Sequence, residues 1–165
     1  MKEDDEVLIQ PFTPPFEKQV ADLILSIQRE EFHIQITLKD QPDLTSIPAV
    51  YQQGIGNFWI AVKSNVVCGT VGLSDIGNYE VALRKMFVSK DFRGHQGIAH
   101  SLIKELFDWC REKSVRKIYL GTVDILKAAH RFYEKNGFVR CSKEELPASF
   151  PLIHVDTIFY KYTFQ

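Results

Sequence analysis

The 165-residue sequence lacks the marks of several classes of protein. It has three widely spaced cysteines (Cys68, Cys110 and Cys141) and no Cys-x-x-Cys pair, so neither a zinc site nor a disulfide framework is indicated. Apolar residues surround each cysteine, and we expect three buried thiols in a reducing compartment. No long apolar run predicts a membrane span, and the acidic start does not resemble a signal peptide. We therefore expect a cytoplasmic protein.

The chain also lacks an excess of charge. Its formal net charge of -1 gives no general attraction to nucleic acid or to an anionic membrane. The hydrophobic fraction of 45% and the charged fraction of 25% are usual for a globular protein, whose core forms without disulfides or a metal. No repeat or linker-like change of composition occurs, and the length suits one domain, residues 1–165.

Hydrophobic periodicity predicts an α+β architecture. In the first half we expect a strand at 7–9, a helix from Thr13-Pro14 to about Glu31, a polar loop at 40–46, a short helix at 47–53, and a meander of strands at 58–62, 66–73 and 81–88. In the second half we expect an amphipathic helix from Ile98, a strand at 118–120, a helix at 126–135 stopped by Asn136-Gly137, and strands at 138–141 and 153–162. The strands at 81–88 and 118–120 should be parallel, because a helix connects them in a βαβ unit.

The segment from Met86 to Ala99 is the most informative, because a strand ends in a glycine-containing loop that opens a long helix. Unpaired N–H groups at a helix start attract anions, and Gly94 and Gly97 allow a phosphate to approach the backbone. A Walker loop would end in Gly-Lys-Ser/Thr, whereas this loop continues Gly97-Ile98-Ala99. A dinucleotide-binding loop would follow the first strand of a βαβ array, whereas this loop follows a meander.

This loop and a second motif resemble the GCN5-related N-acetyltransferase (GNAT) family. Arg93-Gly94 and Gly97-x-Ala99 resemble the family's Gln/Arg-x-x-Gly-x-Gly/Ala loop, and residues 129–138 resemble its Ala-x-x-x-Tyr-Glu-Lys-x-Gly-Phe element. The order of elements matches over nearly the whole chain. Two departures are one extra residue between Arg93 and Gly97, and Leu126 where many members have asparagine. The resemblance implies a mixed, mostly antiparallel seven-stranded sheet with helices on both faces and a central βαβ unit.

The resemblance also implies the chemistry: an acyltransferase in which acetyl-CoA, as cosubstrate, gives its acetyl group to an amine that attacks directly. The pyrophosphate would rest on the N–H groups of 94–99, and the pantetheine arm would pair with the end of strand 81–88. The residues expected to bind the cofactor are Met86, Phe87, Val88, Arg93, Gly94, His95, Gln96, Gly97, Ile98, Ala99, Phe132 and Lys135. Phe132, like Phe138, is more typical of a core aromatic than of a cofactor contact.

The expected catalytic residues are Tyr133 and Glu80. Tyr133 would donate a proton to the departing thiolate, although a core tyrosine is the alternative. Glu80 would act as the general base on a strand face shared with Ala82, Arg84 and Met86, the alternative being a solvated turn carboxylate. His95 is more typical of a loop contact than of a base, and His130 is expected on an exposed helix face.

The acceptor and the assembly stay open at this level. The acidic residues Glu30, Glu31, Asp40 and Asp43 would attract a cationic amine or simply be solvated. A polyamine, an antibiotic, an amino acid, or a protein N-terminus or lysine all remain candidates, as does a longer acyl donor. The alternative function is an acyl-CoA-binding sensor without turnover. A third interpretation, a subunit that forms a homodimer through an edge strand at 153–162, is compatible with catalysis.

Overall fold

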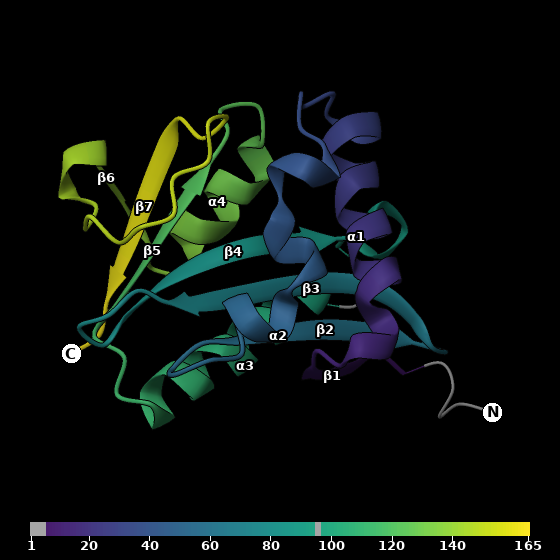
Figure 1. Cartoon of the computed structure of the whole chain (residues 1–165), viewed down its shortest axis with the longest axis horizontal. Helices are drawn as coiled ribbons and strands as arrows, with labels where there is room; N and C mark the ends of the chain where they lie inside the picture. Colours follow the sequence, from purple (N-terminus) through teal and green to yellow (C-terminus); the bar gives the residue numbers. More distant parts are fainter. Residues whose placement is uncertain (1–5, 95–96) are drawn as a thin grey trace.

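A computed structural model describes residues 6–94 and 97–165, which form a seven-stranded sheet with helices on both faces (Figure 1). The strands are β1 (Leu8–Pro11), β2 (Asn57–Lys63), β3 (Val66–Asp75), β4 (Glu80–Val88), β5 (Lys117–Thr122), β6 (Val139–Cys141) and β7 (Ile158–Thr163). The α-helices are α1 (Glu17–Leu25), α2 (Ile47–Val50), α3 (Ile98–Glu112) and α4 (Lys127–Lys135). The order of the strands along the sheet is β1-β2-β3-β4-β5-β7-β6, and among the strands described only the β4–β5 pair is parallel. The predicted fold class and βαβ unit are confirmed.

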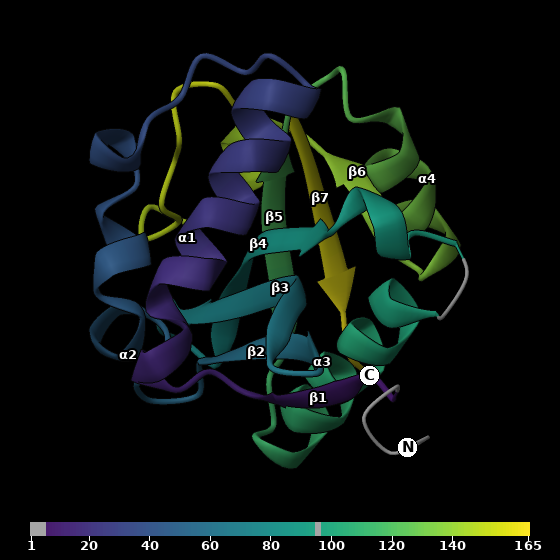
Figure 2. The same ribbon diagram turned by 90° about the vertical axis from the view of Figure 1, so that its right-hand side faces the viewer.

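Two apolar clusters hold the helices against opposite faces of the sheet (Figures 1 and 2). On one face, buried Val20 and Ile24 of α1 pack with Ile47 of α2 against the sheet. On the other face, the stripe of α3 around Leu102 and Leu106 packs beside Tyr133 of α4. Among the residues described, no helix combines the length and the apolar character needed to cross a membrane.

The structure corrects several predicted boundaries. The helix predicted from Thr13 to Glu31 begins as a 3-10 turn, Pro14–Phe16, and ends as a π-helix, Ser26–Glu31. The polar loop predicted at 40–46 contains the 3-10 segment Pro42–Thr45. Cys141 is only half-buried, unlike Cys68 and Cys110.

The last strand differs most from its prediction. It begins at Ile158, because the preceding residues form a turn. In this turn the amide of Asp156 donates to the carbonyl of Ile153 at a usual hydrogen-bond distance of 3.0 Å. It is not an edge strand either, since β7 lies between β5 and β6. The dimer interface expected along 153–162 is therefore wrong, because this strand is paired on both sides.

A β-bulge near the end of β4 interrupts the alternation of its side chains. Residues after the bulge therefore face the opposite helix layer from the one that alternation predicts. The register with β3 shifts between the pairs Gly72↔Arg84 and Thr70↔Phe87, and Lys85 has a positive φ of 59°. The hydroxyl of Thr70 donates to the carbonyl of Lys85 (2.6 Å) at this point. Met86 consequently packs in the same cluster as Leu83. The prediction that Met86 shares the face of Glu80 and Ala82 is wrong for this reason.

The parallel strands β4 and β5 separate before they end. They pair at Glu80↔Lys117, Val81↔Ile118 and Ala82↔Tyr119, and both strands then continue beyond their shared register. Figure 1 shows the two ribbons diverging toward the end of β4. Backbone groups of β4 beyond Ala82 are thus available on the side of β5, where a bound molecule can take the place of a strand.

Candidate active site

The two glycines of the loop between β4 and α3 leave an open surface beside the N-terminus of α3. Gly97 caps α3 in the left-handed conformation, with a φ of 61°, and Gly94 has a φ of 78°. A Cβ atom added at either glycine would meet nothing within 4 Å, so the space beside both backbones is free. The N–H groups of the first turn of this 15-residue helix point out of its N-terminus and carry partial positive charge. These features fit a pyrophosphate group.

This surface continues into a groove that runs into the gap between the strands. An outer hollow above the α3 N-terminus and a middle hollow between β4 and α4 share Val88, Arg93, Ala99 and Phe132. The middle hollow, of about 390 Å³, then meets an inner pocket with which it shares Met86, Phe87, Leu126, Ala129 and Tyr133. One path therefore leads from the glycine loop to the centre of the sheet.

The groove brings together the cofactor-binding residues that the sequence predicts and the structure describes. They are Met86, Phe87, Val88, Arg93, Gly94, Gly97, Ile98, Ala99, Phe132 and Lys135. His95 and Gln96, which were predicted with them, lie outside the described residues. Phe132 lines both hollows and also packs against the core, while its contact with the cofactor stays a prediction.

Arg93 fixes one wall of the groove. Its guanidinium forms an ion pair with Glu31 and donates through Nη2 to Glu31 Oε1 (2.8 Å). Its Nε donates to the carbonyl of Val88 (2.9 Å). Arg93 therefore joins the end of the first helix to the end of β4, and it stands beside the glycine loop as a positive charge.

Tyr133 lies where the middle hollow meets the inner pocket. Its side chain is buried against Phe138 and Tyr160, and burial, followed by the nearby Asp156, raises its pKa. The phenol therefore holds its proton at neutral pH. Tyr133 makes no hydrogen bond to another side chain in the described ranges, which leaves its hydroxyl available to a bound molecule.

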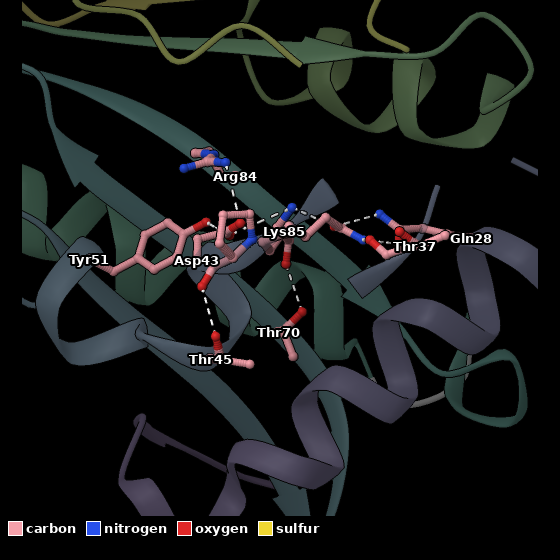
Figure 3. Close-up of polar contacts among 10 residues, drawn as sticks. Gln28, Thr37, Asp43, Thr45, Tyr51, Thr70, Arg84 and Lys85 are labelled. Carbon is pink, nitrogen blue, oxygen red and sulfur yellow. Dashed lines mark hydrogen bonds and ion pairs between the residues drawn. The ribbon is translucent and has the colours of Figure 1, made fainter. Parts of the chain in front are cut away.

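A buried polar network stands behind the inner pocket. Figure 3 shows the side chains of Tyr51, Arg84 and Lys85 converging on Asp43. The hydroxyl of Tyr51 donates to Asp43 Oδ2 (2.5 Å), Lys85 Nζ lies 3.6 Å from Oδ2, and Arg84 Nη2 lies 3.7 Å from Oδ1. Burial lowers the pKa of Lys85 to about 8, although Asp43 acts in the opposite direction. Both cations line the inner pocket.

Asp156 is the carboxylate that lines that pocket, and no pattern in the sequence pointed to it. It precedes β7, in the segment wrongly predicted as strand, and its Oδ2 would lie 2.7 Å from a Cβ added at Gly121. Burial raises its pKa to about 6, while Lys85 and Arg84 lower it. Asp156 shares the pocket lining with Arg84, Lys85 and Tyr133.

Other predicted residues lie elsewhere. Glu80 is buried at the first position of β4 and faces Tyr119, whereas Met86 lies six residues along the strand, roughly 20 Å away. Glu80 is not among the residues that line the groove in the described part of the chain. His130 was expected to be exposed; it is buried, and its Nε2 is hydrogen-bonded to the carbonyl of Val123 (2.9 Å).

The acidic residues expected to attract a cationic amine are engaged within the protein. Glu30 accepts a hydrogen bond from Ser26 (3.0 Å), and Glu31 is paired with Arg93. Asp40 caps its own 3-10 turn, and Asp43 is buried behind Arg84 and Lys85. The charged groups presented to the inner pocket are instead two cations and Asp156.

Comparison with known proteins agrees with this architecture. The family model "Acetyltransferase (GNAT) family" matches residues 21–138. This chain belongs to the GNAT acetyltransferase family. A crystal structure of a GNAT acetyltransferase from Staphylococcus aureus Mu50 is 37% identical, with a TM-score of 0.93 over 96% of this chain and 99% of that chain. Members of this fold have also been solved with coenzyme A or acetyl-CoA, which is the cosubstrate of the family.

Curated relatives share part of their length with this chain. "Probable N-acetyltransferase family 8 member 5" of Mus musculus is 33% identical over 75% of this chain and 57% of that protein. "N-acetylaspartate synthetase" of Danio rerio is 35% identical over 62% of this chain and 37% of that protein. The chain thus spans about half or less of the length of these two relatives.

Proposed function

We propose that this chain is an N-acetyltransferase that moves the acetyl group of acetyl-CoA to an amine within the groove. The observation that carries the proposal is the continuous path from the α3 N-terminus, past the unpaired end of β4, to Tyr133. The groove thus offers three features in the order that acetyl-CoA requires: a phosphate-binding end, a backbone edge for an extended arm, and a proton donor.

The residues of the groove have separate roles in this proposal. The N–H groups at Gly97–Ala99, with Arg93 and Lys135 beside them, hold the pyrophosphate. The backbone of Met86 and Val88 pairs with the pantetheine arm, and the bulge at Lys85 orients the β4 end toward the gap between the strands. One of the backbone N–H groups polarises the thioester carbonyl.

The reaction balances with few protein groups. The nitrogen lone pair of an uncharged amine attacks the carbonyl carbon, and the carbon–sulfur bond breaks. Tyr133 gives a proton to the thiolate of coenzyme A, and the nitrogen that becomes the amide gives one proton to solvent. The products are an N-acetylated amine and coenzyme A, and Tyr133 regains its proton from solvent.

Multiple-turnover release of the coenzyme A thiol, measured with a panel of amines, tests this function. The account predicts catalytic release that requires both acetyl-CoA and an amine, and an acetylated amine detectable by mass spectrometry. The alternative, a sensor of the same fold, predicts saturable binding of acetyl-CoA without release for every amine. Leu126, in place of the family's usual asparagine, is the feature that favours the sensor.

A further inference from the structure

The inner pocket carries a charge arrangement that the acetyl donor does not require. Arg84 and Lys85 enter it from the β4 bulge, and Asp156 enters from the segment before β7. Phe150, Ile153 and Val155 close the same pocket with apolar surface. Because Tyr133 is among the residues that line both this pocket and the middle hollow, an acceptor bound here would meet the thioester near Tyr133.

The two cations of the pocket differ in how fully they are bound. Lys85 Nζ donates to Gln41 Oε1 (2.6 Å), and the amides of Gln41 and Gln28 bond to each other (2.8 and 3.1 Å). Lys85 also faces Asp43 at 3.6 Å, and its side chain is 3% exposed. Lys85 is therefore a positioning residue that holds the network in place behind the pocket.

Arg84, by contrast, has unused hydrogen-bonding capacity. Its guanidinium has five N–H groups, yet its one ion pair is longer than a hydrogen bond, with 3.7 Å between Nη2 and Asp43 Oδ1. Its Nε is buried and has no partner in the described ranges. The guanidinium lies over the ring of Tyr51, 5.5 Å from the centroid, which keeps it in one orientation. A buried donor without a partner is costly, and a ligand that accepts its hydrogen bonds removes the cost.

We propose that the acceptor is an amino acid, or a similar small amine with a carboxylate beside its amino group, and that Arg84 binds the carboxylate. The inference rests on the proposed function and names its substrate class. A carboxylate matches the planar fork of a guanidinium, with two parallel hydrogen bonds that a neutral amide cannot reproduce. Asp43 lies 3.7 Å from Arg84 and 3.6 Å from Lys85, so its contact with Arg84 leaves the hydrogen bonds of the guanidinium fork open to a second anion.

Asp156 complements this arrangement at the amine. It lines the same pocket as Arg84 and Tyr133, and its carboxylate lies against Gly121, where any side chain would displace it. A carboxylate here attracts the ammonium form of the acceptor and accepts its proton before the attack. Its raised pKa, about 6, makes it a better proton acceptor than an ordinary aspartate. The sequence pointed to Glu80 for this role, and Asp156 is the carboxylate that stands at the groove.

Matched acceptors test the inference. Each amino acid is compared with its own carboxamide, which keeps the amine and side chain but removes the negative charge, at saturating acetyl-CoA. We expect kcat/KM to be about 100-fold higher for the best amino acid than for its amide. Arg84→Met should abolish this preference mainly by raising KM for the amino acid. Arg29→Met, at an arginine on the far side of the first helix outside the groove, should keep it.

Further readouts separate binding of the carboxylate from folding and from the proposed function. Arg84→Met should keep its affinity for acetyl-CoA within about twofold, and Arg84→Lys should recover part of the preference. Calorimetric titration of the coenzyme A complex with the best amino acid should show binding that Arg84→Met loses. If amides or amines without a carboxylate are acetylated as well as amino acids, the inference alone is wrong. If acetyl-CoA binds but no amine is acetylated, the proposed function is wrong and the inference fails with it. If wild-type protein does not bind acetyl-CoA, the proposed function fails first and the inference fails with it.

Discussion

Arg93 and Glu31 form an ion pair that joins two segments 62 residues apart in the sequence. The pair ties the π-helical end of the first helix to the glycine loop, and Arg93 also holds the carbonyl of Val88 at 2.9 Å. The orientation of Arg93 beside the groove thus depends on a residue that does not line the outer hollow. This relationship gives a test of how the loop is held.

Glu31→Gln should weaken acetyl-CoA binding by about two- to fivefold, because a half-exposed ion pair contributes at most about 1 kcal/mol. Calorimetric titration measures the change. Glu30→Gln is the matched control, since this exposed neighbour accepts a hydrogen bond from Ser26 (3.0 Å), away from Arg93, and should leave the affinity unchanged. Equal losses in both variants would contradict a specific role of the pair, because removal of a negative charge by itself favours an anionic ligand.

Tyr133→Phe should lower kcat by about 100-fold or more while leaving acetyl-CoA affinity within about twofold, because the phenol acts as the proton donor. Tyr119→Phe removes a hydroxyl near Glu80, away from the groove, and should leave kcat nearly unchanged. Steady-state kinetics with the best acceptor compare the two variants. A Tyr133→Phe enzyme of normal kcat would remove Tyr133 from the chemistry and leave it as a core aromatic.

The β4 bulge should depend on one hydroxyl. Thr70→Val removes the donor to the Lys85 carbonyl (2.6 Å) and leaves that buried acceptor unpaired, which should destabilise the fold by about 1–3 kcal/mol. Thr70→Ser keeps the donor and should lose much less stability. Urea denaturation measures both. Similar losses in the two variants would show that the methyl group matters and that the hydrogen bond does not.

Asp156 should give the folding free energy a specific pH dependence. Its pKa is raised from 3.8 to about 6 in the fold, so the native state binds more protons than the unfolded chain between these values. Its favourable contribution is therefore present below pH 4 and lost as the pH rises to 6. The free energy of unfolding of Asp156→Asn, taken relative to that of wild type, should increase by about 2 kcal/mol between pH 4.5 and pH 7. Urea denaturation at the two pH values gives this double difference. A constant difference would place Asp156 in an ordinary solvated environment.

The glycine loop could be predicted from the sequence because its signal is local. A strand, Gly94, Gly97 and an apolar stripe from Ile98 lie within a short stretch, and the structure places both glycines before or at the start of α3 with positive φ angles. The position of Tyr133 follows in the same way from the 129–138 motif. Both predictions rest on residues that are close together in the sequence, so neither depends on contacts with a distant segment.

The inner pocket could not be predicted because distant segments build it. The bulge at Lys85 arises from the register with Thr70 on the neighbouring strand, so alternation along β4 gave the wrong face for Met86. Asp156 reaches the pocket through a turn that looked like strand and lies against Gly121. The acidic residues near the first helix could be recognised in the sequence. Their partners Arg93, Arg84 and Lys85 could not, because only the fold brings these residues together.

The most direct test of the central claim is a calorimetric titration of acetyl-CoA into wild type, Gly97→Glu and Gly77→Glu proteins. Both glycines have a positive φ, +61° and +87°, and open space around a Cβ, but Gly77 lies in the turn before β4. The strain of substitution is therefore similar, and only Gly97 adjoins the proposed pyrophosphate site. We predict saturable binding by wild type and by Gly77→Glu, and a loss of about 100-fold or more with Gly97→Glu. No binding by wild type, or unchanged binding with Gly97→Glu, would contradict the account.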